Sequence, residues 1–110
     1  MLEIREYIDE LGRSRYADWV NQLDDSTQAR ITIALRRVGT GNLSNVKGVG
    51  SGVFELKLNF GPGFRVYLGK EGDRLVLLLG GGTKRRQEVD IERAKASWQA
   101  YKRRKKAGEL

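Results

Sequence analysis

Basic side chains recur at three places in the second half of the chain where they could meet around a phosphate. Lys57 lies in the alternating apolar and polar run Val53–Leu58. Arg65 lies in the next such run, Phe64–Leu68. Alternate residues of a strand face opposite sides, so antiparallel pairing of the two runs would place Lys57 and Arg65 on one polar face. Lys84-Arg85-Arg86 follows a third strand-like run and would leave the sheet nearby.

Two interpretations of this polar face are open from spacing alone. A cluster of Lys and Arg on a sheet face, walled by helices, has the chemistry of a phosphate site. The alternative is an ordinary solvated face on which Glu55 and arginine pair across strands. Each such pair is worth only ~0.2–1 kcal/mol.

The composition narrows the chemistry that the chain can perform. The net charge is +7, and there is neither cysteine nor histidine. Disulfides, thiolate chemistry and Cys/His zinc sites are therefore excluded, as is the usual general base. We expect no metal and no cofactor. Residues 83–106 carry 10 basic and 3 acidic side chains, against 11 and 10 in residues 1–82. This segment favours a nucleic-acid partner, the alternative being a basic helix that only aids solubility.

Length and hydropathy suggest a single cytoplasmic domain. The 110 residues suit one domain spanning 1–110. The longest apolar run, Leu75–Leu79, is far shorter than the ~18 residues of a membrane span. The charged N-terminal residues do not resemble a signal peptide, so the expected location is the cytoplasm.

The first half of the chain predicts a strand and two helices. Leu2–Tyr7 alternates apolar and polar residues, as a short strand does. Arg15–Leu23 has apolar residues at helical spacing. Asp24-Asp25-Ser26 offers N-caps for a second helix, which Gly39 and Gly41 end. The short connection favours an antiparallel helix pair.

The second half predicts a meander followed by a helix. Asn42–Gly52 is interpreted as a loop, and the three strand-like runs follow it. The wholly apolar Leu75–Leu79 should be central and buried on both faces. Gly80-Gly81-Gly82 should be a flexible exit from that strand, followed by loop to about Arg86, and the last helix should begin near Val89. In that helix Trp98 and Tyr101 share a face with Ile91 and Ala94, which favours a core role over base stacking.

The predicted order is β-α-α-β-β-β-α, which is an α+β fold with a mainly antiparallel sheet packed against helices. The basic residues 102–106 should fray, and residues 102–110 form a candidate disordered tail. Within that tail Lys102 and Arg103 offer a general grip on a polyanion.

Two segments carry a resemblance to a known family. Gly52–Tyr67 is similar to the "G-V-x-E-L-[RK]…G-P-G-[YF]-R-V-Y" segment of the RelE/HigB-like toxins. The stretch from Leu75 to Ala94 is similar to the "LLxGGxKxxQxxDIxxA" segment of the branch called addiction-module killer proteins. The two segments appear in the expected order and separation, and the first half also agrees in order and length. The resemblance therefore covers nearly the whole chain.

The resemblance implies a compact RelE-like domain that acts as a type II toxin. Family toxins enter the ribosomal A site and cut mRNA there, which inhibits translation. A cognate antitoxin, in this branch typically a helix-turn-helix DNA-binding protein, silences the toxin. The pair then represses its own operon, so operator DNA is contacted through the antitoxin. Ribosome, mRNA and antitoxin are the implied partners.

The resemblance also implies roles for individual residues. Arg65 matches the strand arginine that binds the phosphate and the transition state. Lys57 matches a phosphate clamp or proton-transfer group. Lys84 and Arg85 match positions that stabilise the leaving group and contact the RNA backbone. Gln87 would orient the ribose or a base. Arg86, Lys102 and Arg103 are added as RNA contacts.

The chain departs from the family pattern at the proton-transfer positions. Some relatives use histidines, and this chain has none. Asp90 stands nearest to a tyrosine of some relatives, and could be a base or simply a helix-start cap. Glu55 lies where certain relatives carry a second lysine. The general base and acid therefore stay open.

Two other functions remain open from the sequence. A related ParE-like toxin would inhibit DNA gyrase without cutting RNA. A non-toxic nucleic-acid-binding module would bind in a salt-sensitive way and be harmless when expressed.

Overall fold

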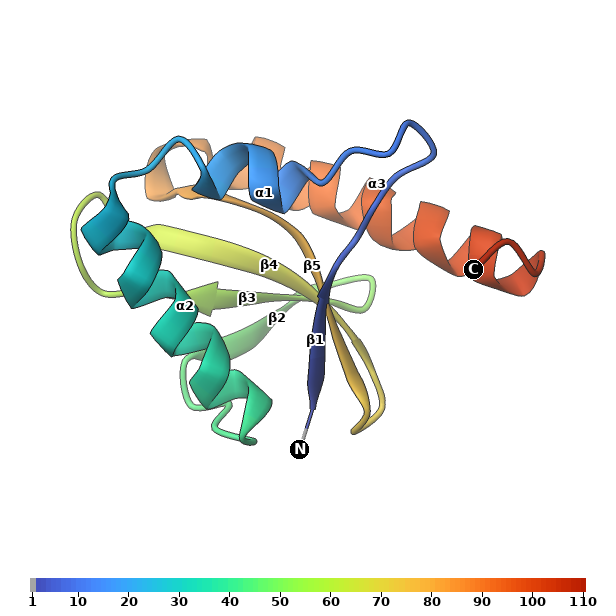
Figure 1. The fold of residues 1–110 in the computed structure, drawn as a ribbon, viewed down its shortest axis with the longest axis horizontal. Coiled ribbons are helices and arrows are strands. Elements are labelled where there is room, and N and C mark those ends of the chain that lie inside the picture. Colours follow the sequence, from blue (N-terminus) through green and yellow to red (C-terminus); the bar gives the residue numbers. More distant parts are fainter. Residues whose placement is uncertain (1) are drawn as a thin grey trace.

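The computed structural model of the chain describes residues 2–110 (Figure 1). Five strands, three α-helices and one short 3₁₀ turn follow one another within these residues. In chain order they are β1 (Glu3–Glu6), α1 (Arg15–Val20), α2 (Asp25–Gly39), β2 (Val46–Gly50), β3 (Val53–Lys57), β4 (Phe64–Glu71), β5 (Leu75–Thr83), η1 (Lys84–Arg86) and α3 (Gln87–Lys106).

The five strands form one sheet in the order β1-β5-β4-β3-β2. β1 runs parallel to β5, from Glu3 opposite Leu75 to Glu6 opposite Leu78. All other neighbours are antiparallel. Helices α1 and α2 lie on one face of the sheet, and α3 crosses the other (Figure 1). The predicted α+β class with a mainly antiparallel sheet is confirmed.

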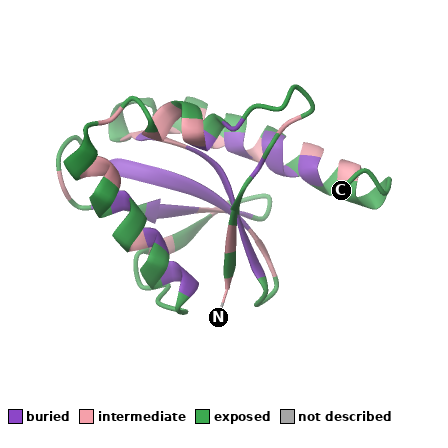
Figure 2. Ribbon diagram, viewed as in Figure 1, coloured by how far each residue is buried: buried purple, intermediate pink, exposed green. Residues whose placement is uncertain are grey.

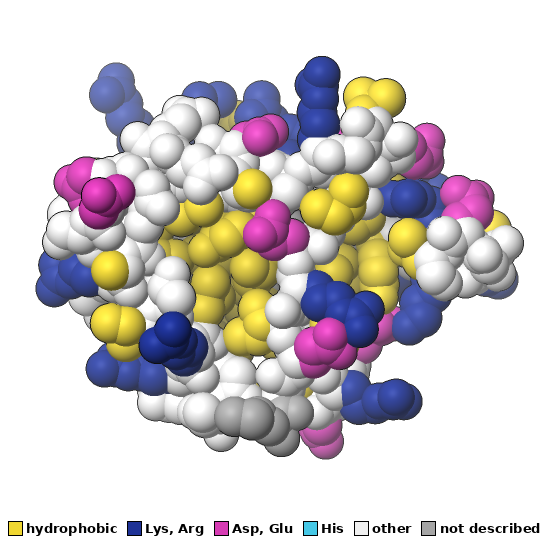
Figure 3. All heavy atoms as spheres, viewed as in Figure 1, with side chains coloured by type: hydrophobic (Ala, Val, Ile, Leu, Met, Phe, Trp, Pro, Cys, Tyr) yellow, Lys and Arg dark blue, Asp and Glu magenta, His cyan; other side chains and the backbone are white. Residues whose placement is uncertain are grey.

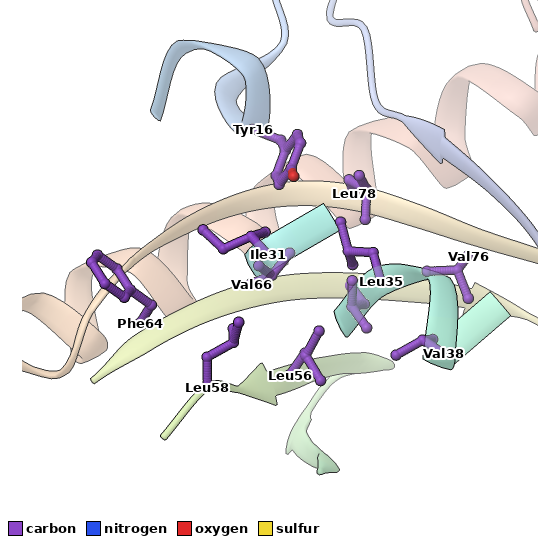
Figure 4. Close-up of a cluster of buried hydrophobic side chains, with 11 residues drawn as sticks. Tyr16, Ile31, Leu35, Val38, Leu56, Leu58, Phe64, Val66, Val76 and Leu78 are labelled. Carbon is purple, nitrogen blue, oxygen red and sulfur yellow. The ribbon is translucent and has the colours of Figure 1, made fainter. Parts of the chain in front are cut away.

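The face under α2 carries the first of two hydrophobic cores (Figure 4). Ile31, Leu35 and Val38 project from α2 at spacings of four and three, which places them on one side of the helix. They pack on alternate residues of the strands, among them Leu56 and Val66. Ile31 and Val66 are completely buried. The apolar stripe predicted for the second helix therefore does fix its position on the sheet.

The opposite face packs against α3 and makes the second core. Figure 2 shows buried bands along α3, and the buried residues of this helix include Ala94, Trp98 and Tyr101. They meet Leu77 and Leu79, whereas Val76 and Leu78 of the same strand belong to the first core. The prediction that Leu75–Leu79 is buried on both faces is confirmed, as is the core role of both aromatic residues.

Both N-terminal helices begin at side-chain caps. Ser14 Oγ accepts a hydrogen bond from Ala17 N–H at 3.0 Å, and Asp24 Oδ1 accepts one from Thr27 N–H at 2.7 Å. Such caps satisfy backbone donors that the first turn leaves unpaired. The cap predicted at Asp24 is confirmed, and α1 ends at Val20, three residues earlier than expected.

The structure also corrects three of the predicted segments, namely the loop before the meander, the last strand and the last helix. The predicted loop Asn42–Gly52 contains β2, whose poor strand propensity is overridden by its pairing with β3. β5 continues through Gly80–Gly82 to Thr83 instead of ending at Leu79. α3 starts at Gln87, earlier than Val89, and stays helical through Lys106, where fraying was expected. None of the helices in residues 2–110 has the length and apolar character of a membrane span.

The glycines of β4 and β5 explain why strand residues were mistaken for loop. Side chains lie directly against the backbone at these positions, so that a Cβ at Gly69 would overlap the Trp98 ring and a Cβ at Gly81 would overlap the Trp19 ring. Glycine here marks a close approach rather than flexibility.

The variant Gly69→Ala tests this packing. We expect it to destabilise the fold by roughly 1–3 kcal/mol or more, because overpacking forces the Trp98 indole away from the sheet. Chemical denaturation monitored by tryptophan fluorescence measures the free energy of unfolding. Gly48→Ala in β2 is the control, since its Cβ would meet Phe54 at an ordinary 3.8 Å. Equal stability of the two variants would contradict the described packing.

Candidate functional site

One end of the sheet gathers three of the predicted site residues. The Cα atoms of Lys57 and Arg65 are register partners, and Arg65 is in turn opposite Gly82 on β5. Lys84 N–H donates to the Gly63 carbonyl at 3.0 Å, which ties η1 to the turn that precedes β4. The end of β3, the start of β4 and the end of β5 thus bring these positions together.

The cations at this end differ in their access to solvent. Lys57, Lys84, Arg85 and Arg86 are exposed. Arg65 has only 5% of its surface accessible. Of the two interpretations left open by the sequence, the Glu–Arg pair is present, but it is buried under α3 and not solvated, while Lys57 stays exposed.

Arg65 belongs to a buried polar network with Glu55 and Gln87. Arg65 Nε lies 3.5 Å from Glu55 Oε2, and Arg65 Nη1 donates to the Gly63 carbonyl at 2.8 Å. Gln87 Nε2 donates to Glu55 Oε1 at 2.9 Å. Glu55 is only 1% exposed. The network joins β3, β4 and the first residue of α3.

The sequence offered cross-strand pairing of Glu55 with arginine as an alternative, but on a solvated face and not on a buried one. Strand alternation grouped Glu55 with Lys57 as a solvent-facing residue. The signal that could have found it is that the same parity also includes Val53 and Tyr67, two residues suited to a buried face. A sheet face that carries apolar residues on two strands is half-buried, and a carboxylate on it needs a partner.

Tyr67 and Asp90 extend the cluster toward α3. Tyr67 is completely buried, and its hydroxyl has no hydrogen-bond partner within the described residues. Burial, together with the charges of Asp90 and Glu55, raises the pKa of Tyr67 to about 12. The phenol therefore stays protonated at neutral pH.

Asp90 is not the cap of the last helix. The N-cap position is Arg86, and Asp90 lies in the first turn of α3. Its carboxylate sits directly over Gly82, where a Cβ would overlap it. Burial raises the pKa of Asp90 above its usual value, while the charges of Arg86 and Arg93 act in the opposite direction. Asp90 is thus a partly buried carboxylate with heightened proton affinity.

Asp90 lies in a groove of about 380 Å³ between α1 and the start of α3. The floor is the backbone of Leu79–Thr83, beyond the last residue with which β1 pairs. Its walls carry three arginines and two aspartates, namely Arg15, Arg86, Arg93, Asp18 and Asp90. The groove is open to a polar ligand, and its glycine floor allows close approach to the main chain.

Lys102 and Arg103 lie outside this cluster. They are exposed near the C-terminal end of α3, roughly 22 Å along the helix from Gln87 at 1.5 Å per residue. Their neighbour Lys105 binds Glu71 with a shortest N–O distance of 2.6 Å. On the face drawn in Figure 3, Lys and Arg side chains are scattered over the rim and the middle and do not form one patch. Residues 2–110 hold no group of three or more Asp or Glu placed to bind a metal ion.

Comparison with known proteins supplies one relative. No family model matches the chain. A protein of Haemophilus influenzae described as "Uncharacterized protein" is 38% identical over 81 residues, which is 73% of this chain and 82% of that protein. The chain belongs to the same family as this Haemophilus protein. Because the name of the relative states no activity, the function of the family has to be argued from the site.

Removal of Glu55 tests the buried network. We expect Glu55→Ala to lower the free energy of unfolding by about 3–5 kcal/mol, because Arg65 would keep a buried and uncompensated charge. The double variant Glu55→Leu/Arg65→Met should recover most of that loss. Urea denaturation of the three chains measures both effects.

The exposed pair of Glu3 and Arg5 provides the matched control. Its side chains are 55% and 62% exposed, so Glu3→Ala should change stability by less than about 1 kcal/mol. Similar losses in Glu3→Ala and Glu55→Ala would contradict the importance assigned to burial.

The variant Asp90→Asn tests whether burial disfavours the ionised form of this carboxylate. Because the folded pKa of Asp90 lies above the ordinary 3.8, the folded chain binds this proton more tightly than the unfolded chain. Ionisation of Asp90 therefore lowers stability. We expect Asp90→Asn to melt at a higher temperature than the wild type at pH 7, with the difference closing as the pH falls toward 3.8. Calorimetric scans over that range measure it, and a less stable variant at pH 7 would refute the assignment.

Proposed function

We propose that the chain is a type II toxin of the RelE/HigB-like kind, a ribosome-dependent endoribonuclease that cuts mRNA and stops translation. The observation that supports this most directly is the groove in which the exposed Arg15, Arg86 and Arg93 line the walls together with Asp90. Lys57 is two strand spacings from Gly82, about 10 Å, and Asp90 covers Gly82. Such an arrangement suits a phosphodiester flanked by cations and a proton acceptor.

The reaction follows from the groups available. Asp90 accepts the proton of a ribose 2′-hydroxyl as its oxygen attacks the adjacent phosphorus. The bond from phosphorus to the 5′-oxygen breaks, and the Lys84 ammonium donates a proton to that oxygen. The products are a 2′,3′-cyclic phosphate and a 5′-hydroxyl end. Lys57 and Arg86 neutralise the charge that gathers on the phosphate oxygens.

The buried network gives Arg65 and Gln87 a supporting role in this proposal. Both bind Glu55, and through it they hold the ends of β3 and β4 against the start of α3. Both are therefore positioning residues in this proposal. Arg65 is not assigned the direct phosphate contact that the resemblance implies. Arg85, Lys102 and Arg103 are exposed and contact the backbone of mRNA or ribosomal RNA.

The proposed partners follow from this activity. The chain acts in the cytoplasm on ribosome-bound mRNA and needs no cofactor. A cognate antitoxin with a helix-turn-helix DNA-binding domain silences it, and the pair binds operator DNA through that antitoxin.

Inducible expression in bacteria tests the proposal. Wild type should arrest growth and yield new mRNA fragments with 5′-hydroxyl ends when message ends are mapped. Lys84→Ala and Asp90→Asn should each reduce cleavage by roughly 10²-fold or more, the usual effect of losing a charge-stabilising or proton-transfer group. Arg36→Ala is the control. It replaces an exposed residue of α2, and the variant should remain toxic. Circular dichroism confirms that each variant is folded. Full cleavage by both site variants would refute the assigned roles.

The buried position of Arg65 favours a second candidate. A ParE-like toxin acting on DNA gyrase needs no accessible arginine for phosphate chemistry, and Arg65 is only 5% exposed. Growth arrest with gyrase–DNA breaks and intact mRNA would support that candidate. Harmless expression with salt-sensitive nucleic-acid binding would instead identify a non-toxic binding module.

A further inference from the structure

A second groove lies on the face of the sheet that α2 covers, between α2 and β3. It has a volume of about 340 Å³, near the lower end of the ~300–1,000 Å³ of ligand sites. Its basic lining residues are Arg30, Arg37 and the end of β3 at Lys57, whose side chain alternates with those of Leu56 and Leu58, and no Asp or Glu occurs among the described residues that line it. The groove between α1 and α3, in contrast, mixes arginines with aspartates. The α2 groove is therefore the stronger anion site by charge.

One wall of the α2 groove offers neutral hydrogen-bonding groups. Asn42, Ser44 and Asn45 line it. Asn42 Oδ1 accepts hydrogen bonds from Ser44 Oγ at 2.6 Å and Ser44 N–H at 3.1 Å, which orients its amide. Lys57 N–H donates to the Asn45 carbonyl at 3.1 Å, so the wall is tied to the end of β3. Amide and hydroxyl groups beside cations suit the polar edges of a nucleotide.

The lining of the groove also includes a cation over an aromatic ring. The Arg30 guanidinium carbon lies 4.1 Å from the centre of the Phe60 ring. This contact holds the guanidinium plane over an aromatic ring at the edge of the groove. Unstacked bases of single-stranded RNA bind to such aromatic and arginine planes.

The groove offers little apolar surface to a helical partner. Val38, Leu56 and Leu58 line it but are only 1%, 3% and 6% exposed. Ile33, at 47%, is the one large aliphatic side chain of the described lining that is well exposed. An amphipathic acidic helix would need a continuous apolar seam, with anchors at successive helical turns. The chemistry therefore favours a nucleic-acid segment over an acidic peptide.

We propose that the α2 groove binds a single-stranded RNA segment next to the scissile phosphate. Arg30 and Arg37 contact its phosphates, and a base stacks on the Arg30 plane. Lys57 lines this groove and is also the register partner of Arg65, so it joins the groove to the candidate site. The inference rests on the RNA-directed function proposed above and adds the place where the flanking nucleotides lie.

Fluorescence anisotropy with a labelled eight-nucleotide single-stranded RNA tests the groove. Arg30→Ala/Arg37→Ala should bind at least ~10-fold more weakly than wild type. The slope of log affinity against log salt should fall by about 1.4, or 0.7 per lost phosphate contact. Arg30→Lys/Arg37→Lys keeps the charge and should retain most of that slope. Arg36→Ala is the matched control, because Arg36 is exposed on the same helix and does not line the groove.

The outcomes separate this inference from the proposed function. If wild type binds and cuts RNA and the double alanine variant does both equally well, the groove assignment is overturned and the function stands. If wild type arrests growth without cutting message, the proposed nuclease fails, whatever the binding result. If wild type shows no RNA binding, or if a Glu-rich peptide binds in the groove while RNA does not, the inference is wrong. Unchanged melting temperatures of the variants show that losses of binding are not losses of folding.

Discussion

The ion pair between Glu55 and Arg65 constrains the architecture around the candidate site more than any other contact. The two groups are 1% and 5% exposed, and charges so far from water are costly unless they are paired and hydrogen-bonded. The Gly63 carbonyl accepts from Arg65 Nη1 and Gln87 donates to Glu55, whereas Arg65 Nε has only the ionic contact with Glu55 at 3.5 Å among the described residues. The start of α3 therefore cannot move off the sheet without exposing the pair, and the turn before β4 cannot change shape without releasing Arg65.

Three close contacts with strand glycines also hold α1 and α3 against the sheet. Trp98 lies on Gly69, Trp19 lies on Gly81 and the carboxylate of Asp90 lies on Gly82. Each glycine removes the side chain that would otherwise hold a helix farther from the strand. The resulting position of Asp90 is unfavourable for its charge, since burial raises its pKa. A group held at a cost to stability beside several cations is a common property of functional sites, where stability and activity oppose each other.

The sheet end separates two grooves with different charge patterns. One lies between α1 and α3, over the backbone of Leu79–Thr83, and combines arginines with Asp18 and Asp90. The other lies beside α2 and has only cationic and neutral polar groups in its described lining. Lys57 lines the second groove and is also the register partner of Arg65 on the neighbouring strand. A polyanion that follows the positive side chains would cross the end of the sheet, and the carboxylate in the first groove would meet it there.

The sequence by itself determined the α+β class, the capped second helix, the doubly buried strand at Leu75–Leu79 and the core roles of Trp98 and Tyr101. These features depend on local periodicity and capping, which residue spacing encodes directly. It also predicted that Lys57, Arg65 and Lys84 would meet at one end of the sheet, because register follows from antiparallel pairing. Tertiary structure alone decided that α3 covers this face, that Glu55 neutralises Arg65 and that Gly80–Gly82 is strand. Those outcomes depend on which helix packs against which face, and the partners involved lie far apart in the sequence, as Glu55 and Gln87 do at a separation of 32 residues. A polar residue in a strand gives the same sequence pattern whether water or a helix covers it. Only the folded chain could therefore distinguish a solvated polar face from a buried ion pair.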